Sequence, residues 1–74
     1  MPDATPMQIA ISLNGSPMLI DAGISISDLL LLAGYGERRV AVECNGEIVP
    51  RSQHAQQSLA AADRIEIVQA IGGG

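Results

Sequence analysis

The fold depends on one stretch near the end of the chain, Asp63-Arg64-Ile65-Glu66-Ile67-Val68-Gln69-Ala70, which runs directly into Ile71-Gly72-Gly73-Gly74. The isoleucines of the first stretch alternate with polar side chains, and this period of two is typical of a strand with one buried face. The stretch is also among the most apolar in the sequence. We therefore expect a central strand of a sheet whose end carries a glycine tail.

Working outward from this strand, the same alternation recurs in the rest of the chain. Four further segments are expected to be strands: residues 8–13, 18–21, 40–44 and 47–49. Asn14-Gly15 separates the first two and Asn45-Gly46 separates the last two. Asn-Gly is the dipeptide that best fits a tight hairpin turn, because both turn residues need a positive φ. The four segments should therefore form two hairpins.

One helix is expected, over Ile24–Gly34, with Ser25 as its N-cap and Asp28 completing a capping box. Its apolar residues share one face at helical spacing, and they are Ile26, Leu29, Leu30 and Ala33. Four consecutive leucines cannot all face inward, so Leu31 or Leu32 should be partly exposed. The polar segment 51–59 is expected to contain a short helix capped by Ser52.

These elements predict one α+β domain, in which a mixed sheet of about five strands packs on a single helix. The domain should span residues 7–70. Residues 1–6 contain two prolines and are expected to be a mobile leader. Residues 71–74 are expected to be a flexible tail.

Composition excludes several functional classes. The chain has 74 residues, a net charge of −4, one tyrosine and no other aromatic residue, so nucleic-acid binding is not expected. It has no apolar run long enough for a membrane span. A single cysteine fits a reducing compartment, and we expect a cytoplasmic monomer. Lysine is absent, which excludes a P-loop or Schiff-base lysine.

The side chains offer few parts for catalysis. Cys44 and His54 are too few to hold a zinc ion, so no metal site is expected. Cys44 is better explained as a small buried strand residue than as a persulfide carrier. His54 is better explained by local packing or hydrogen bonding than as a general base. We expect no catalytic residue and no bound cofactor, and interpret the chain as a substrate of other enzymes rather than as an enzyme.

The remaining reactive group is the terminal carboxylate of Gly74. A carboxylate is a poor electrophile, but its attack on the α-phosphate of ATP gives an acyl-adenylate, from which a sulfur nucleophile can displace AMP. Gly72 and Gly73 lack a Cβ and would let the tail thread a narrow channel in a partner. Four extended residues reach roughly 13 Å. Because the chain has no phosphate-binding motif, a partner enzyme must bind the ATP.

The sequence resembles the sulfur carrier family of thiamine biosynthesis, which has the ubiquitin-like β-grasp fold. The resemblance rests on VAVECNGEIVPR at residues 40–51, SQH at 52–54, DRIEIV at 63–68 and the final Gly73-Gly74, within a likeness that covers residues 7–74. The NGEIVPR stretch is more specific to the thiazole branch than the diglycine is. One departure is Ala62, since such carriers often have a glycine before the acid that opens the last strand. A left-handed turn is therefore not assumed there.

The resemblance implies a reaction cycle. An adenylyltransferase of the ubiquitin-activating type would use MgATP to adenylate Gly74. Sulfur originating from a cysteine desulfurase would then convert the carboxylate to a thiocarboxylate (1-thioglycine). A thiazole synthase would take that sulfur into the thiazole ring.

Two alternatives remain open from the sequence. The chain could be a sulfur carrier of the molybdopterin-synthase type, with the same tail and another acceptor. It could also be a β-grasp module that binds partners without covalent chemistry. Conjugation of the tail to protein lysines also stays open.

The partner-docking face is expected beside the last strand, because the tail leaves from its end. The candidate docking residues are Glu43, Glu66 and Ile71. Acidic side chains on such a face should mainly steer the encounter with a basic partner.

Overall fold

The computed structural model describes residues 7–36 and 38–69. Its helices and strands follow in the order β1 (Gln8–Leu13), β2 (Ser16–Asp21), α1 (Ile26–Leu32), β3 (Val40–Cys44), β4 (Glu47–Val49), the 3-10 helix η1 (Arg51–Gln53) and β5 (Arg64–Gln69). The expected leader and tail, together with Glu37 and Ala70, lie outside the described residues.

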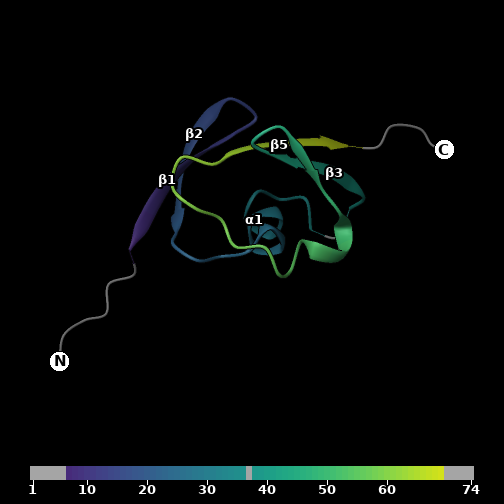
Figure 1. Ribbon diagram of the computed structural model, residues 1–74, viewed down its shortest axis with the longest axis horizontal. Helices are drawn as coiled ribbons and strands as arrows, with labels where there is room; N and C mark the ends of the chain where they lie inside the picture. The colour runs from purple at the N-terminus through teal and green to yellow at the C-terminus, as the bar shows by residue number, and fades with distance from the viewer. Residues whose placement is uncertain (1–6, 37, 70–74) are drawn as a thin grey trace.

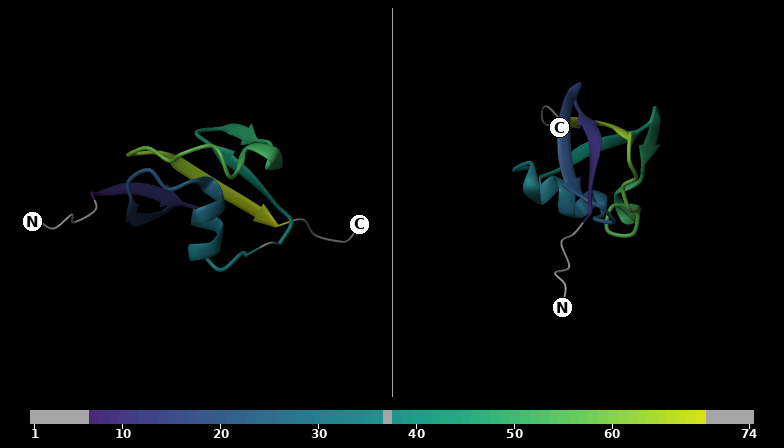
Figure 2. Two further views of the ribbon diagram at one scale, coloured as in Figure 1. Left: turned by 90° about the horizontal axis from the view of Figure 1, so that it is seen from below. Right: turned by 90° about the vertical axis from the view of Figure 1, so that its left-hand side faces the viewer.

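The five strands form one mixed sheet in the order β2-β1-β5-β3-β4 (Figure 1). The hairpins β1–β2 and β3–β4 are antiparallel, as is the β3–β5 pair, whereas β5 runs parallel to β1. The last strand is therefore central, as the sequence predicts. Helix α1 and the segment that follows β4 lie on one face of the sheet (Figure 2). The expected five-stranded mixed sheet on one helix is confirmed.

The core is purely aliphatic and lies between the sheet and α1. Among the described residues its buried hydrophobic side chains are Ile11, Ile20, Ile26, Leu29, Leu30, Val42, Val49, Leu59, Ile65 and Ile67. Ile65 and Ile67 of β5 face this core, while the residues between and beside them are exposed. The strict alternation of the last strand is therefore what fixes which of its side chains remain available at the surface.

Both Asn-Gly turns have the conformation that tight hairpins need. Asn14 and Gly15 have φ of 50° and 86°, and Asn45 and Gly46 have φ of 54° and 88°. Asn14 also joins its hairpin to the central strand, because Asn14 Oδ1 accepts the Ile67 N–H at 2.8 Å. The first hairpin begins its second strand at Ser16, two residues earlier than expected, since Ser16 pairs with Leu13.

Helix α1 is shorter than the predicted Ile24–Gly34. Ser25 is its N-cap and forms the predicted capping box with Asp28. The helix cannot begin at Ile24, because the Ile24 carbonyl accepts the Leu59 N–H at 2.9 Å and holds this residue in an extended pairing. At the other end Gly34 has φ of 91°, and the Tyr35 N–H donates to the Leu30 carbonyl. This is the left-handed glycine stop that the sequence predicts.

One local prediction is wrong. Ser52 does not cap a helix: it lies inside η1, whose N-cap is Pro50 and makes no side-chain cap bond. The Gln53 N–H instead donates to the Pro50 carbonyl at 2.8 Å, which closes a 3-10 turn. At Ala62, where no left-handed turn was assumed, the backbone is left-handed, with φ of 72°. The turn before β5 is therefore left-handed although alanine occupies it.

Candidate functional site

The site predicted from the sequence is the chain end that follows β5. The described part of β5 ends at Gln69, which pairs with Val40 at the start of β3. Gly72, Gly73, Gly74 and the docking candidate Ile71 lie outside the described residues. The structure describes the strand that precedes these residues, β5, which is the central strand of the sheet.

The sheet has an open face on the side away from α1. The open-face patch consists of Ala41, Glu43, Ile48, Glu66 and Val68. Register places Glu43 opposite Glu66 and Ala41 opposite Val68, while Ile48 of β4 lies opposite Glu43. Ile48 is 64% exposed and Val68 58%, so the patch combines apolar side chains with two carboxylates.

The two candidate docking carboxylates, Glu43 and Glu66, therefore lie opposite each other on paired strands. Glu66 is exposed and Glu43 is half-buried. Like charges directly opposite each other on paired strands destabilise a sheet slightly. An arrangement of this kind favours a basic partner group, which would relieve the repulsion.

Cys44 lies at the end of β3, beside the turn that fastens β3 to β5. Burial is the main cause that raises the pKa of the Cys44 thiol, and the carboxylate of Asp63 raises it further. The side-chain amide of Asn45 donates to Asp63 Oδ1 at 3.0 Å and to the Cys44 sulfur at 3.6 Å. A raised pKa disfavours the thiolate, which is the reactive form. The structure thus supports the prediction that Cys44 is a packed strand residue.

His54 is buried, with 6% of its surface exposed. Its Nε2 lies 3.1 Å from the Val49 carbonyl oxygen. A carbonyl can only accept, so Nε2 carries the hydrogen of this bond. The backbone carbonyl of His54 in turn accepts the Ser27 N–H at 2.9 Å, which joins this loop to the start of α1. The expected local hydrogen bonding of His54 is confirmed.

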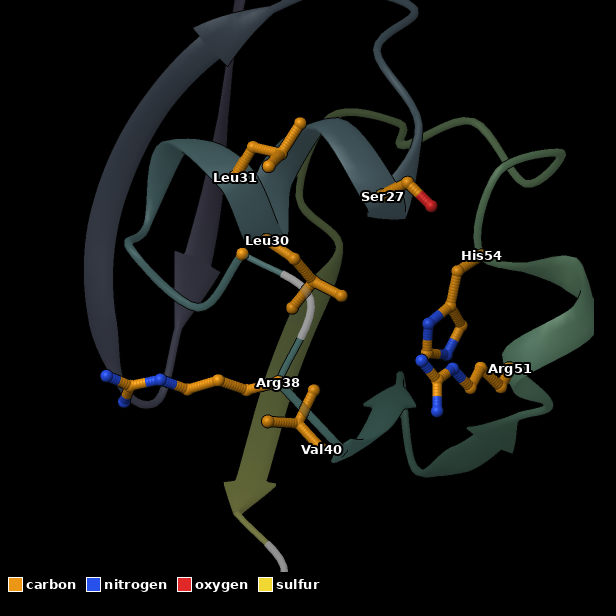
Figure 3. Close-up of a pocket in the computed structure, with 8 residues that line it drawn as sticks. Ser27, Leu30, Leu31, Arg38, Val40, Arg51 and His54 are labelled. Atoms are coloured by element: carbon orange, nitrogen blue, oxygen red, sulfur yellow. The ribbon is translucent and has the colours of Figure 1, made fainter.

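Sequence reasoning missed a cavity of about 300 Å³ on the helix side of the molecule (Figure 3). The residues that matter for its chemistry are Ser27, Leu30, Arg38, Val40, Arg51 and His54. They come from α1, the loop after it, β3 and η1. No spacing of residues in the sequence predicts the cavity, because these segments come together only when α1 packs against β3 and η1.

Within residues 7–36 and 38–69 no cluster of three His, Cys, Asp or Glu side chains could hold a metal ion. In the same ranges, no helix is long and apolar enough to cross a membrane.

Comparison with known proteins gives a consistent result. The model of the ThiS family matches residues 11–74. A relative called thiazole synthase, from Paramagnetospirillum magneticum, is 44% identical over 62 residues, which are 84% of this chain and 19% of that protein. A thiazole synthase from Magnetococcus marinus is 41% identical over 64 residues, which are 86% of this chain and 20% of that protein. The chain thus spans about a fifth of the length of these two relatives.

Two further matches are of similar length to this chain. The uncharacterized protein ycf40 of Pyropia yezoensis is 33% identical over 66 residues, which are 89% of this chain and 93% of that protein. The crystal structure of the thiamine biosynthesis protein ThiS from Geobacter metallireducens superposes with a TM-score of 0.76 at 28% identity. That superposition covers 89% of this chain and all of the other.

Proposed function

The chain belongs to the ThiS family, and from this membership we propose that it is a sulfur carrier of thiamine biosynthesis, with the sulfur carried on the C-terminal carboxylate of Gly74. The observation that carries the proposal is that the family match continues through Gly74 itself. The match thus includes the reactive end that follows the central strand. Partners bind the folded domain, and this binding positions the C-terminal end for reaction.

The chemistry needs three outside components. An adenylyltransferase of the ubiquitin-activating type binds MgATP. An oxygen of the Gly74 carboxylate attacks the α-phosphate of this ATP while pyrophosphate leaves. A cysteine desulfurase provides sulfur as a persulfide, whose terminal sulfur attacks the carbonyl carbon. The carbon–sulfur bond forms as AMP leaves, and the product is an acyl disulfide. A thiol reductant then cleaves the sulfur–sulfur bond, which releases the C-terminal thiocarboxylate and leaves a disulfide between the donor and the thiol.

Thiazole synthase is the proposed acceptor of this sulfur. Support comes from two relatives that carry that name and contain a segment 41–44% identical to this chain as about a fifth of their length. A carrier-like segment and the rest of a protein named thiazole synthase therefore occur on one polypeptide. We infer that the two parts cooperate, and that this chain donates its sulfur to a thiazole synthase.

The open-face patch is the proposed docking surface of the body. Its exposed apolar side chains, Ile48 and Val68, flank Glu43 and Glu66, and apolar contact with a polar rim is the usual composition of a protein interface. Val68 lies two residues before the first residue outside the described part of β5, so a partner that contacts it is close to the tail. Ile71 would add to the contact where the tail enters the partner.

A reconstituted assay tests the proposal. The chain is incubated with the adenylyltransferase, MgATP, a cysteine desulfurase with cysteine, a thiol reductant, and thiazole synthase with its other substrates. Thiazole formation is measured by chromatography. A chain that lacks Gly74 is the matched control, and its thermal melt shows that it folds. Thiazole formation that depends on Gly74 supports the proposal. Sulfur delivery to a molybdopterin synthase but not to thiazole synthase would contradict it.

A further inference from the structure

The cavity beside α1 gathers positive charge in an acidic protein. The chain has only five basic side chains, four arginines and one histidine, against eight acidic ones. Arg38, Arg51 and His54, three of the five, line this cavity. None of its described lining residues is acidic. Two permanently charged guanidinium groups, those of Arg38 and Arg51, therefore line one cavity of a molecule whose net charge is −4.

His54 gives the cavity a fixed polar wall. The ring is 6% exposed and is held by its Nε2, which donates to the Val49 carbonyl at 3.1 Å. Its Nδ1 has no hydrogen-bond partner among the described residues. In the view of Figure 3 the His54 ring, the Arg51 guanidinium and the Ser27 hydroxyl all lie on one side of the cavity that they line. Three polar groups thus converge at one end of the cavity.

The rest of the cavity is apolar. Leu30 and Val40 form its middle, and Arg38 extends along the opposite side, away from Arg51 (Figure 3). The side-chain hydrogen bonds among the described residues leave both guanidinium groups unused. A volume of about 300 Å³ is at the small end of ligand pockets.

We propose that this cavity binds the phosphate group of a small phosphate monoester. The Arg51 guanidinium matches two phosphate oxygens through its fork of N–H donors. The Ser27 hydroxyl donates to another phosphate oxygen. His54 Nδ1 is an acceptor while Nε2 carries the ring hydrogen, so it accepts the P–OH hydrogen of the monoprotonated ester, and the organic part of the ester rests on Leu30 and Val40. Arg38 at the rim attracts the anion without contacting it. The site faces away from the open-face patch and does not depend on the role of Gly74.

The test is a titration of the full ¹⁵N-labelled chain, followed by NMR, with inorganic phosphate and separately with phenyl phosphate at constant ionic strength. Saturable shifts of the Ser27, Arg38 and His54 amides are expected, with tighter binding of phenyl phosphate. Arg51→Gln should weaken binding about tenfold or more, the usual effect of losing a charged hydrogen bond. Arg38→Gln should have a smaller effect, and the control variants Arg39→Gln and Arg64→Gln none.

His54→Gln provides a second variant, because the glutamine amide replaces the Nε2 donor but not Nδ1. It should keep its fold, seen in the amide spectrum, and bind phenyl phosphate more weakly. The proposal is overturned if no saturable shift appears at these amides, or if Arg39→Gln weakens binding as much as Arg51→Gln. Equal affinity for benzoate and phenyl phosphate would also overturn it, since the site would then select carboxylates.

Discussion

Replacement of Ala62 by glycine should stabilise the domain, because Ala62 has a left-handed backbone with φ of 72°. This conformation costs roughly 1–2 kcal/mol in a residue with a Cβ. Glycine avoids that cost but loses more chain entropy on folding, which offsets about 0.5–1 kcal/mol. The side chain of Ala62 is exposed, so its removal sacrifices no core packing. We expect a net gain of about 0.5–1 kcal/mol in the free energy of unfolding.

The surrounding hydrogen bonds show why Ala62 keeps this conformation. Its N–H donates to the Ala10 carbonyl at 2.8 Å, which attaches the turn to β1. The carboxylate of Asp63 accepts the Ala60 N–H at 2.9 Å, which closes the turn from the other side. The turn is therefore fixed at both ends, and the strain at Ala62 cannot relax by a local shift.

Thermal and urea unfolding measure the effect. A gain of this size should raise Tm by about 2–8 °C in a domain of this length. Ala61→Gly is the matched control, because Ala61 lies in the same exposed turn without a positive φ. It should lower stability by about 0.5–1 kcal/mol through chain entropy alone. A loss of stability in Ala62→Gly equal to that in Ala61→Gly would refute the argument from backbone strain.

Three further predictions concern partners and chemistry. Because burial raises the pKa of the Cys44 thiol above the ordinary 9.0, alkylation of this thiol at pH 8 should be slower in the folded chain than in the unfolded chain. Equal alkylation rates would contradict the raised pKa. The Cys44→Ser variant should still form the thiocarboxylate. The double variant Glu43→Lys, Glu66→Lys should associate more slowly with the adenylyltransferase at low salt, as measured by stopped flow, and should keep the Tm of the parent chain. Unchanged association kinetics would show that the docking face lies elsewhere. Gly73→Ala should still bind the adenylyltransferase but impair pyrophosphate release, because the added Cβ obstructs a narrow channel, and normal release would rule out threading.

Much of the fold follows from short-range patterns. The alternation around Ile65 and Ile67 predicts that β5 is a strand with one buried face, and its high apolar content is what predicts the central place that it takes in the sheet. The Asn-Gly pairs specify both hairpins through their positive φ values. Ser25 and Asp28 specify the start of α1 through the capping box. Each of these signals acts within a few residues, so each is visible in the sequence.

The features that were missed depend on contacts distant in sequence. Ile24 stays out of α1 because Leu59 pairs with its carbonyl, and alanine takes a left-handed turn at Ala62 because β1 holds that turn. The cavity around His54 needs three separate segments to pack together. Of the candidate site, the outward position of Glu43 and Glu66 was predictable from the alternation of their strands, whereas the register that places them opposite each other comes from the structure. The tail chemistry rests on the family resemblance.

The most direct measurement of the central claim is the location of the sulfur. After incubation with the adenylyltransferase, MgATP and a sulfur source, cleavage after arginine releases residues 65–74 and, separately, residues 40–51, which contain Cys44. Tandem mass spectrometry of the two peptides, with a sample lacking ATP as control, then places the added sulfur. The account predicts one oxygen-to-sulfur exchange on Gly74, dependent on ATP, and no sulfur added to residues 40–51. Sulfur found on Cys44 with an unchanged Gly74 would contradict it.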